Sequence, residues 1–78
     1  MSMQVLYEIA GSDKGWAAQR AAMVIAITEQ LQAQQITREE ALELMQDLVR
    51  MDQLDAEADD IALKTALVSA VWAVAQVV

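Results

Sequence analysis

The sequence contains no cysteine, no histidine, no proline and no phenylalanine, and it has only two glycines. Without cysteine there is neither a disulfide nor a thiolate metal site, and without histidine the commonest general base and transition-metal ligand is missing. The three serines have no histidine to activate them, which excludes a Ser-His nucleophile. A chain without cysteine fits a reducing compartment, and the first residues lack the basic and apolar segments of a signal peptide. We therefore expect a cytoplasmic protein.

The residues that interrupt helices are also scarce. With no proline, and glycine only at positions 11 and 15, nothing breaks a helix after residue 15. Fifteen of the 78 residues are alanine, and leucine, methionine, glutamine and glutamate, which are also strong helix formers, supply much of the rest. Since 78 residues allow one domain with a small core, we predict an all-α fold with a single helical domain over residues 1–78.

The spacing of apolar residues predicts three helices joined by short turns, at about 13–35, 38–51 and 56–77. The simplest arrangement of such helices is a small up-down-up bundle. The strongest local signal is a capping box, in which the Thr37 hydroxyl and the Glu40 carboxylate satisfy each other's backbone N–H groups at the start of the second helix. The other two helices have candidate caps in Ser12 or Asp13 and in Asp52 or Asp55.

Residues 1–11 form an arm whose conformation the pattern leaves open. Val5, Tyr7 and Ile9 alternate with other residues, as in a short strand. Ser2 can equally cap a short amphipathic helix that runs over residues 3–10. Because a strand here needs a second copy of the protein to pair with, we favour a short helix or an ordered arm.

Acidic residues outnumber basic ones by twelve to five, which gives a net charge of −7, and nine of the acids lie between residues 39 and 60. This charge repels DNA, RNA and anionic membranes, so we expect no direct nucleic-acid partner. It favours instead a protein partner with a basic surface. The acids that make up this candidate partner surface are Glu39, Glu43, Asp47, Asp52, Asp55, Glu57, Asp59 and Asp60.

These acids do not match a known type of catalytic or metal site. A calcium loop that starts at Asp55 has Asp60 where glycine is required and Ala66 where an acidic ligand is required. There is no glycine-rich phosphate loop, and the acids fall on the outer faces and ends of the predicted helices, not in a cleft. We therefore expect no catalytic residue, no metal and no cofactor, and a protein that is not an enzyme.

The last eighteen residues, 61–78, contain no acid and only one base, Lys64. This segment is rich in alanine and close to the shortest possible membrane span, so we do not expect it to cross a membrane. A three-helix monomer leaves part of such an apolar helix exposed, which is rare for a monomer. We therefore expect a homodimer that completes the bundle through the third helix. The candidate dimer interface consists of Leu63, Leu67, Val71, Trp72, Val74 and Val78.

Three functional hypotheses remain open at this point. The leading one is a small, non-enzymatic protein-protein interaction module, an adaptor or regulator that acts as a homodimer. The second is an acidic inhibitor that imitates nucleic acid, of the kind that phages and mobile elements use. The third is a small membrane-active protein that acts through residues 61–78.

Overall fold

The computed structural model describes residues 2–77 and places them in five helices. The helices are α1 (Ser2–Ala10), α2 (Gly15–Gln32), α3 (Arg38–Leu48), α4 (Met51–Glu57) and α5 (Ile61–Val77). No strand occurs within residues 2–77, so the predicted all-helical class is confirmed and the strand alternative for residues 3–10 is wrong. The predicted number of three helices is too low, because the expected arm forms α1 and an additional short helix, α4, precedes α5.

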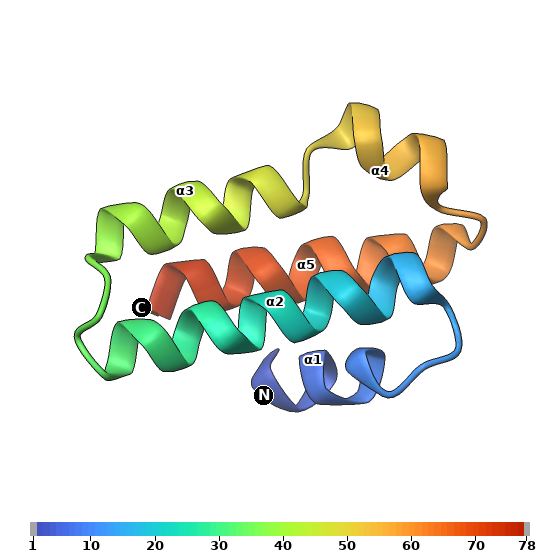
Figure 1. The fold of residues 1–78 in the computed structure, drawn as a ribbon. Helices are drawn as coiled ribbons and strands as arrows, with labels where there is room; N and C mark the ends of the chain where they lie inside the picture. Colours follow the sequence, from blue (N-terminus) through green and yellow to red (C-terminus); the bar gives the residue numbers. More distant parts are fainter. Residues whose placement is uncertain (1, 78) are drawn as a thin grey trace.

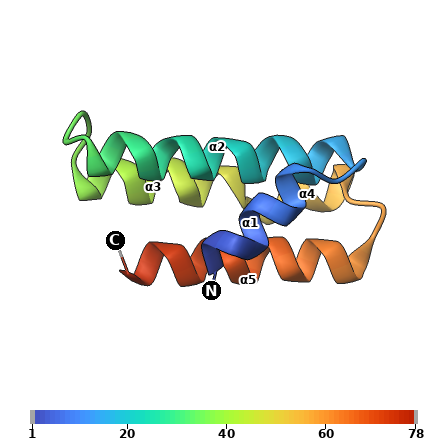
Figure 2. The ribbon, with the colours of Figure 1, turned by 90° about the horizontal axis from the view of Figure 1, so that it is seen from below.

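The three longest helices lie side by side, with α2 and α5 running in the same direction and α3 in the opposite one (Figure 1). The short helix α1 crosses obliquely over α2 and α5 and packs against both (Figure 2). Its apolar residues Leu6 and Ile9 are buried there. Helix α1 therefore covers the apolar side of α5, which the three predicted helices would leave exposed.

This cover changes the role of the predicted dimer interface. Leu67, Val71 and Val74 are fully buried within one chain, so the prediction that they meet a second copy is wrong. They point toward the core that α5 shares with α1, α2 and α3. Leu63 is half-buried against the same core, and Trp72 is exposed. Val78 lies outside the described residues.

Helix α3 ends at Leu48, three residues earlier than predicted, and α4 follows, displaced from the line of α3 (Figure 1). Arg50, between them, has an extended backbone. The apolar pattern explains the break, because Leu54 follows Met45 by nine residues, or about two and a half helical turns. In one continuous helix these side chains would point in opposite directions, yet both are fully buried. The break lets both reach the same core.

The ends of the helices confirm one predicted cap and correct the others. The capping box at α3 is confirmed, with Glu40 N–H donating to Thr37 Oγ1 at 3.1 Å and Thr37 N–H donating to Glu40 Oε1 at 2.9 Å. Bonding to Thr37, first through its backbone N–H, lowers the pKa of Glu40. Asp60 caps α5, since its Oδ1 accepts from Leu63 N–H at 3.0 Å. Asp52 and Asp55 do not cap α5, because they lie in α4.

Helix α2 begins at Gly15, and neither Ser12 nor Asp13 caps it. The N-cap residue is Lys14, which makes no side-chain capping bond. Ser12 belongs instead to the end of α1, where its backbone N–H donates to the Ile9 carbonyl at 3.0 Å. Its hydroxyl is buried and has no hydrogen-bond partner among the described residues.

Candidate functional site

Most of the acidic residues between 52 and 60 are held in contacts within the chain. Four of the five basic residues of the sequence pair with acids of this segment. The pairs are Arg50–Asp52, Lys64–Asp55, Arg20–Glu57 and Lys14–Asp59. The fifth acid of the segment, Asp60, caps α5. This part of the acidic run is therefore largely neutralised by the fold itself.

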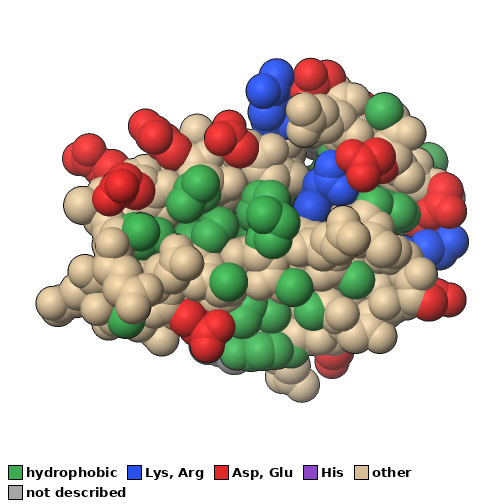
Figure 3. Space-filling view, in the orientation of Figure 1, with side chains coloured by type: hydrophobic (Ala, Val, Ile, Leu, Met, Phe, Trp, Pro, Cys, Tyr) green, Lys and Arg blue, Asp and Glu red, His purple; other side chains and the backbone are tan. Residues whose placement is uncertain are grey.

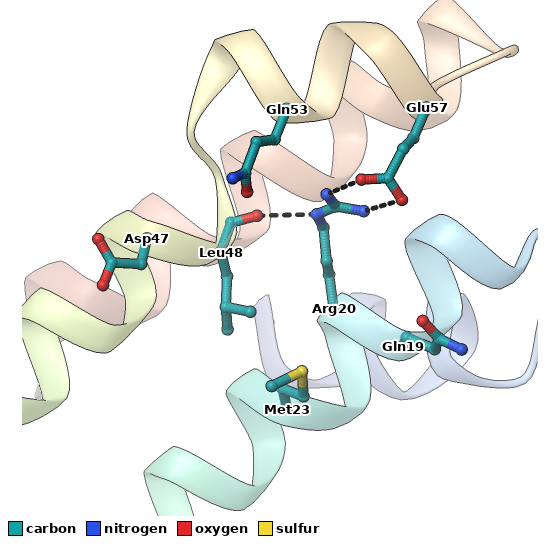
Figure 4. A pocket seen from close by; sticks show the side chains of 7 residues that line it. All are labelled: Gln19, Arg20, Met23, Asp47, Leu48, Gln53 and Glu57. Atoms are coloured by element: carbon teal, nitrogen blue, oxygen red, sulfur yellow. Dashed lines mark hydrogen bonds and ion pairs between the residues drawn. The ribbon is translucent and has the colours of Figure 1, made fainter.

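Arg20, on α2, is the centre of the most extensive of these contacts (Figure 4). Its side chain is only 12% exposed. It donates from Nε to the Leu48 carbonyl at 2.9 Å, from Nη1 to the Trp16 carbonyl at 2.9 Å, and from Nη2 to Glu57 Oε2 at 2.8 Å. Because Leu48 is the last residue of α3, the guanidinium of Arg20 also interacts favourably with the negative end of that helix dipole. Arg20 thus joins α2, α3 and α4, and its hydrogen bond lowers the pKa of Glu57.

Asp59 makes a second link between α2 and the segment before α5. Its carboxylate accepts from the Trp16 indole Nε1 at 3.0 Å and from Lys14 Nζ at 3.1 Å. The indole bond, followed by the lysine bond, lowers the pKa of Asp59, and the bond to Asp59 raises the pKa of Lys14. The side chains of Lys14 and Asp59 are 39% and 61% exposed, so solvent weakens the ion pair between them.

The acids of α3 behave differently. Glu39, Glu43 and Asp47 lie four residues apart and are all exposed, so they form a row along the outer side of the helix, which we call the acidic row. None of the three makes an ion pair within residues 2–77. Acidic side chains line this edge of the molecule in Figure 3.

The helix dipole favours an acid at the N-terminal end of the acidic row and disfavours one at its C-terminal end. Glu39 lies in the first turn of α3, where a negative charge favours the helix. Asp47 lies in the last turn, which holds no base, and there a negative charge costs about 0.3–1 kcal/mol at low salt. Glu43 and Asp47 are also a like-charge pair one turn apart, which adds about 0.2–0.5 kcal/mol of repulsion. The C-terminal half of the row therefore does not stabilise the helix.

The candidate partner surface from the sequence thus separates into two groups. Asp52, Asp55, Glu57 and Asp59 are engaged in ion pairs and Asp60 in a helix cap. Of the eight acids of this candidate surface, only the three of the acidic row have neither an ion pair nor a capping bond among residues 2–77.

A cleft of about 240 Å³ opens next to the row, between α2 and the junction of α3 and α4 (Figure 4). It is lined by Gln19, Arg20, Met23, Asp47, Leu48, Gln53 and Glu57. Small-molecule sites usually enclose about 300–1,000 Å³, so this cleft is too small for a typical ligand and suits a single side chain. The cleft could not be predicted from the sequence, because its walls come from three helices whose packing the sequence does not specify. The one available signal was Arg20, the only charged residue in the first fourteen positions of α2.

Two further properties bear on function. Within residues 2–77, no group of three or more histidine, cysteine or acidic side chains is arranged to hold a metal ion. None of the described helices combines the length and the apolar character that crossing a membrane requires.

No family model matches this chain, and comparisons with curated proteins and with solved structures gave no significant match.

Proposed function

We propose that this protein is a small, non-enzymatic interaction module, an adaptor or regulator that binds a protein with a basic surface through the acidic row of α3. The observation that carries the proposal is the contrast between the two groups of acids. The fold neutralises the acids of residues 52–59 with four bases, whereas Glu43 and Asp47 face solvent at some cost to their own helix. A basic partner would remove that cost on binding.

We also propose self-association through the outward side of α5. Trp72 is 42% exposed there, and its exposed neighbours along that side are uncharged. They are Ala62, Thr65, Ala66, Ser69 and Gln76. A chain with a net charge of −7 repels its own copies at acidic surfaces, so an uncharged side with a tryptophan is the favoured place for two copies to meet. Sedimentation of the wild type as a monomer at about 100 µM, a concentration that populates even weak dimers, would exclude this part of the proposal.

Mimicry of nucleic acid is a second candidate function. The observation in its favour is the regular spacing of the acidic row, which presents like charges one helical turn apart on an exposed face. This function requires that the partner be a nucleic-acid-binding protein and that DNA or RNA compete for the same site.

The experiment that tests the main proposal is affinity capture from the cells of origin with two charge-reversal baits. In the bait Glu43→Lys/Asp47→Lys, capture of the specific partners should be lost, although the fold should be at least as stable as the wild type because the negative end of α3 gains a cation. The control bait Glu8→Lys/Asp13→Lys changes the net charge equally at acids outside α3, and it should retain the partners. If both baits capture the same proteins as the wild type, the acidic row is not a binding surface.

A further inference from the structure

The acidic row borders the seam where α2 and α3 pack together, and this seam exposes apolar side chains. We call the seam, together with the cleft at its end, the groove. Met23 of α2 is 53% exposed and Leu44 of α3 is 43% exposed. Leu48, one turn after Leu44, is half-buried and lines the cleft together with Met23. Apolar side chains gather along this seam in Figure 3. Two of the six large exposed hydrophobic residues in the described chain therefore line one continuous feature.

The outer surface of α2 next to this groove is small and uncharged. Ala22 and Ala26 are exposed, and no residue between Ala21 and Thr28 is charged. Small side chains let another backbone approach closely, and methionine adapts its shape to different partners. The groove thus has a flat floor on α2 and larger side chains where α2 meets α3.

The cleft lies at the end of the groove where α3 stops. In Figure 4, Met23 and Leu48 lie on its α2 and α3 sides, while Arg20 and Glu57 close it toward α4. The guanidinium of Arg20 is occupied by Glu57 and two backbone carbonyls, so it does not present a free positive charge to a ligand. Asp47 belongs both to the cleft and to the acidic row, so the apolar and the acidic surfaces are contiguous.

We propose that this groove docks an amphipathic helix of a partner protein, with an apolar side chain in the cleft and lysine or arginine residues over Glu43 and Asp47. This inference rests on the proposed function and specifies the partner of the same acidic row. A helix is the expected form, because a peptide strand needs the edge of a sheet and residues 2–77 contain none. An apolar stripe flanked by cations matches the apolar groove and its acidic border.

A second copy of this chain does not fit as the occupant. The sequence has five bases, and four of them are already paired with acids. No helix of the described chain therefore carries a row of available cations. Two copies would also bring acidic rows together, which repels.

The groove can be tested with a synthetic peptide of about eighteen residues, built from leucine and lysine so that leucine occupies one helical face. Binding is followed by fluorescence anisotropy of the labelled peptide, and its position by amide chemical shifts of the protein. We expect the largest shifts at Ala22, Met23, Ala26 and Leu44, and a Kd that rises at least about fivefold between roughly 50 mM and 300 mM salt. A peptide with glutamate in place of lysine should not bind, and a scrambled peptide without an apolar face should bind at least about tenfold more weakly.

Two pairs of variants separate the groove from general effects of charge and hydrophobicity. Met23→Gln/Leu44→Gln should raise the Kd about tenfold, whereas Ile61→Gln, at an 81% exposed residue on α5, should change it less than twofold. Glu43→Gln/Asp47→Asn should raise the Kd about fivefold at low salt, whereas Glu8→Gln/Asp13→Asn, with the same change in net charge, should leave it within twofold. Circular dichroism at the temperature of the binding assay checks that each variant folds. The exposed Leu44→Met variant, which keeps an apolar side chain of similar size, should retain binding.

Equal effects of the groove and control variants would overturn the inference, as would chemical shifts centred on Trp72 or equal binding of the glutamate peptide. The proposed function is tested separately, by the proteins that each bait captures in the affinity experiment. If Met23→Gln/Leu44→Gln baits retain partners that the Glu43→Lys/Asp47→Lys bait loses, the groove inference fails and the proposed function stands. If the charge-reversal bait loses no partner, the proposed function fails.

Discussion

Gln34, just after α2, is the one described residue other than glycine with a positive φ, at 62°. It occupies the left-handed position of a helix-ending motif in which Gln34 N–H donates to the Leu31 carbonyl at 3.1 Å and Gln35 N–H donates to the Gln30 carbonyl at 2.9 Å. Glycine usually occupies this position, because a side chain in the left-handed region costs about 1–2 kcal/mol. From the sequence this helix is predicted to reach residue 35, because no glycine or proline marks its end.

The substitution Gln34→Gly should therefore stabilise the protein. Glycine removes the strain but gains more freedom in the unfolded chain, so we expect a net increase of about 0.5–1 kcal/mol in the free energy of unfolding, measured in urea. Gln34→Ala is the control, since alanine keeps the strain and should change stability by less than about 0.5 kcal/mol. A glycine variant no more stable than the alanine variant would show that the positive φ costs nothing.

Most of the helices could be predicted from the sequence, whereas the break between α3 and α4 and the packing of the helices could not. The capping box at Thr37 was predicted because its signal lies within four residues. The break after Leu48 was missed because it depends on where Met45 and Leu54 are buried, which only the packed fold determines. Likewise, the pattern of α1 left helix and strand open, and its position across α2 and α5 could not be read from local residues.

Helix α1 should contribute substantially to stability despite its nine residues. Leu6 is fully buried where α1 crosses the core, so Leu6→Ala should lower the free energy of unfolding by about 2–5 kcal/mol. The adjacent Tyr7 is exposed, and Tyr7→Ala should change it by less than about 0.5 kcal/mol. Both values come from urea denaturation at neutral pH. If the two variants proved equally stable, α1 would be a loosely attached arm and α5 would be exposed in solution.

At the scale of the whole molecule, the fold divides a continuous acidic run into two surfaces. The sequence correctly located the acids but not their partners, because Lys14, Arg20 and Lys64 reach their acids from 45, 37 and 9 residues away along the chain. Once these bases are used within the fold, Glu39, Glu43 and Asp47 remain as a row of acids without ion pairs on α3, while Glu8, Asp13 and Glu29 lie singly elsewhere in residues 2–77. The Met23–Leu44 groove was also invisible, since each residue by itself fits an ordinary helix.

The same division predicts how stability depends on pH. The pKa of Asp59 is lowered in the folded protein by its bonds to Trp16 and Lys14, so its contribution to stability is present above the ordinary pKa of 3.8. That contribution is lost as the pH falls through the lowered, folded-state pKa. The variant Asp59→Asn can still accept the indole bond but carries no charge. The wild type should therefore be more stable than Asp59→Asn at about pH 7, and the difference should shrink as the pH falls below about 3.8.

Urea denaturation of both proteins between about pH 7 and pH 2.5 measures this difference. Raising the salt to about 1 M at neutral pH should also reduce it, because the Lys14–Asp59 pair is open to solvent and is screened. Measurements at alkaline pH test the direction of the stability difference independently. Since Asp59 raises the pKa of Lys14, the advantage of the wild type is present below the ordinary lysine pKa of 10.5 and falls as the pH rises through the higher folded-state value. If the two proteins were equally stable at neutral pH and low salt, the charge of Asp59 would contribute nothing, Asp59 would act only as a hydrogen-bond acceptor for Trp16, and Lys14 would remain available to an acid of a partner.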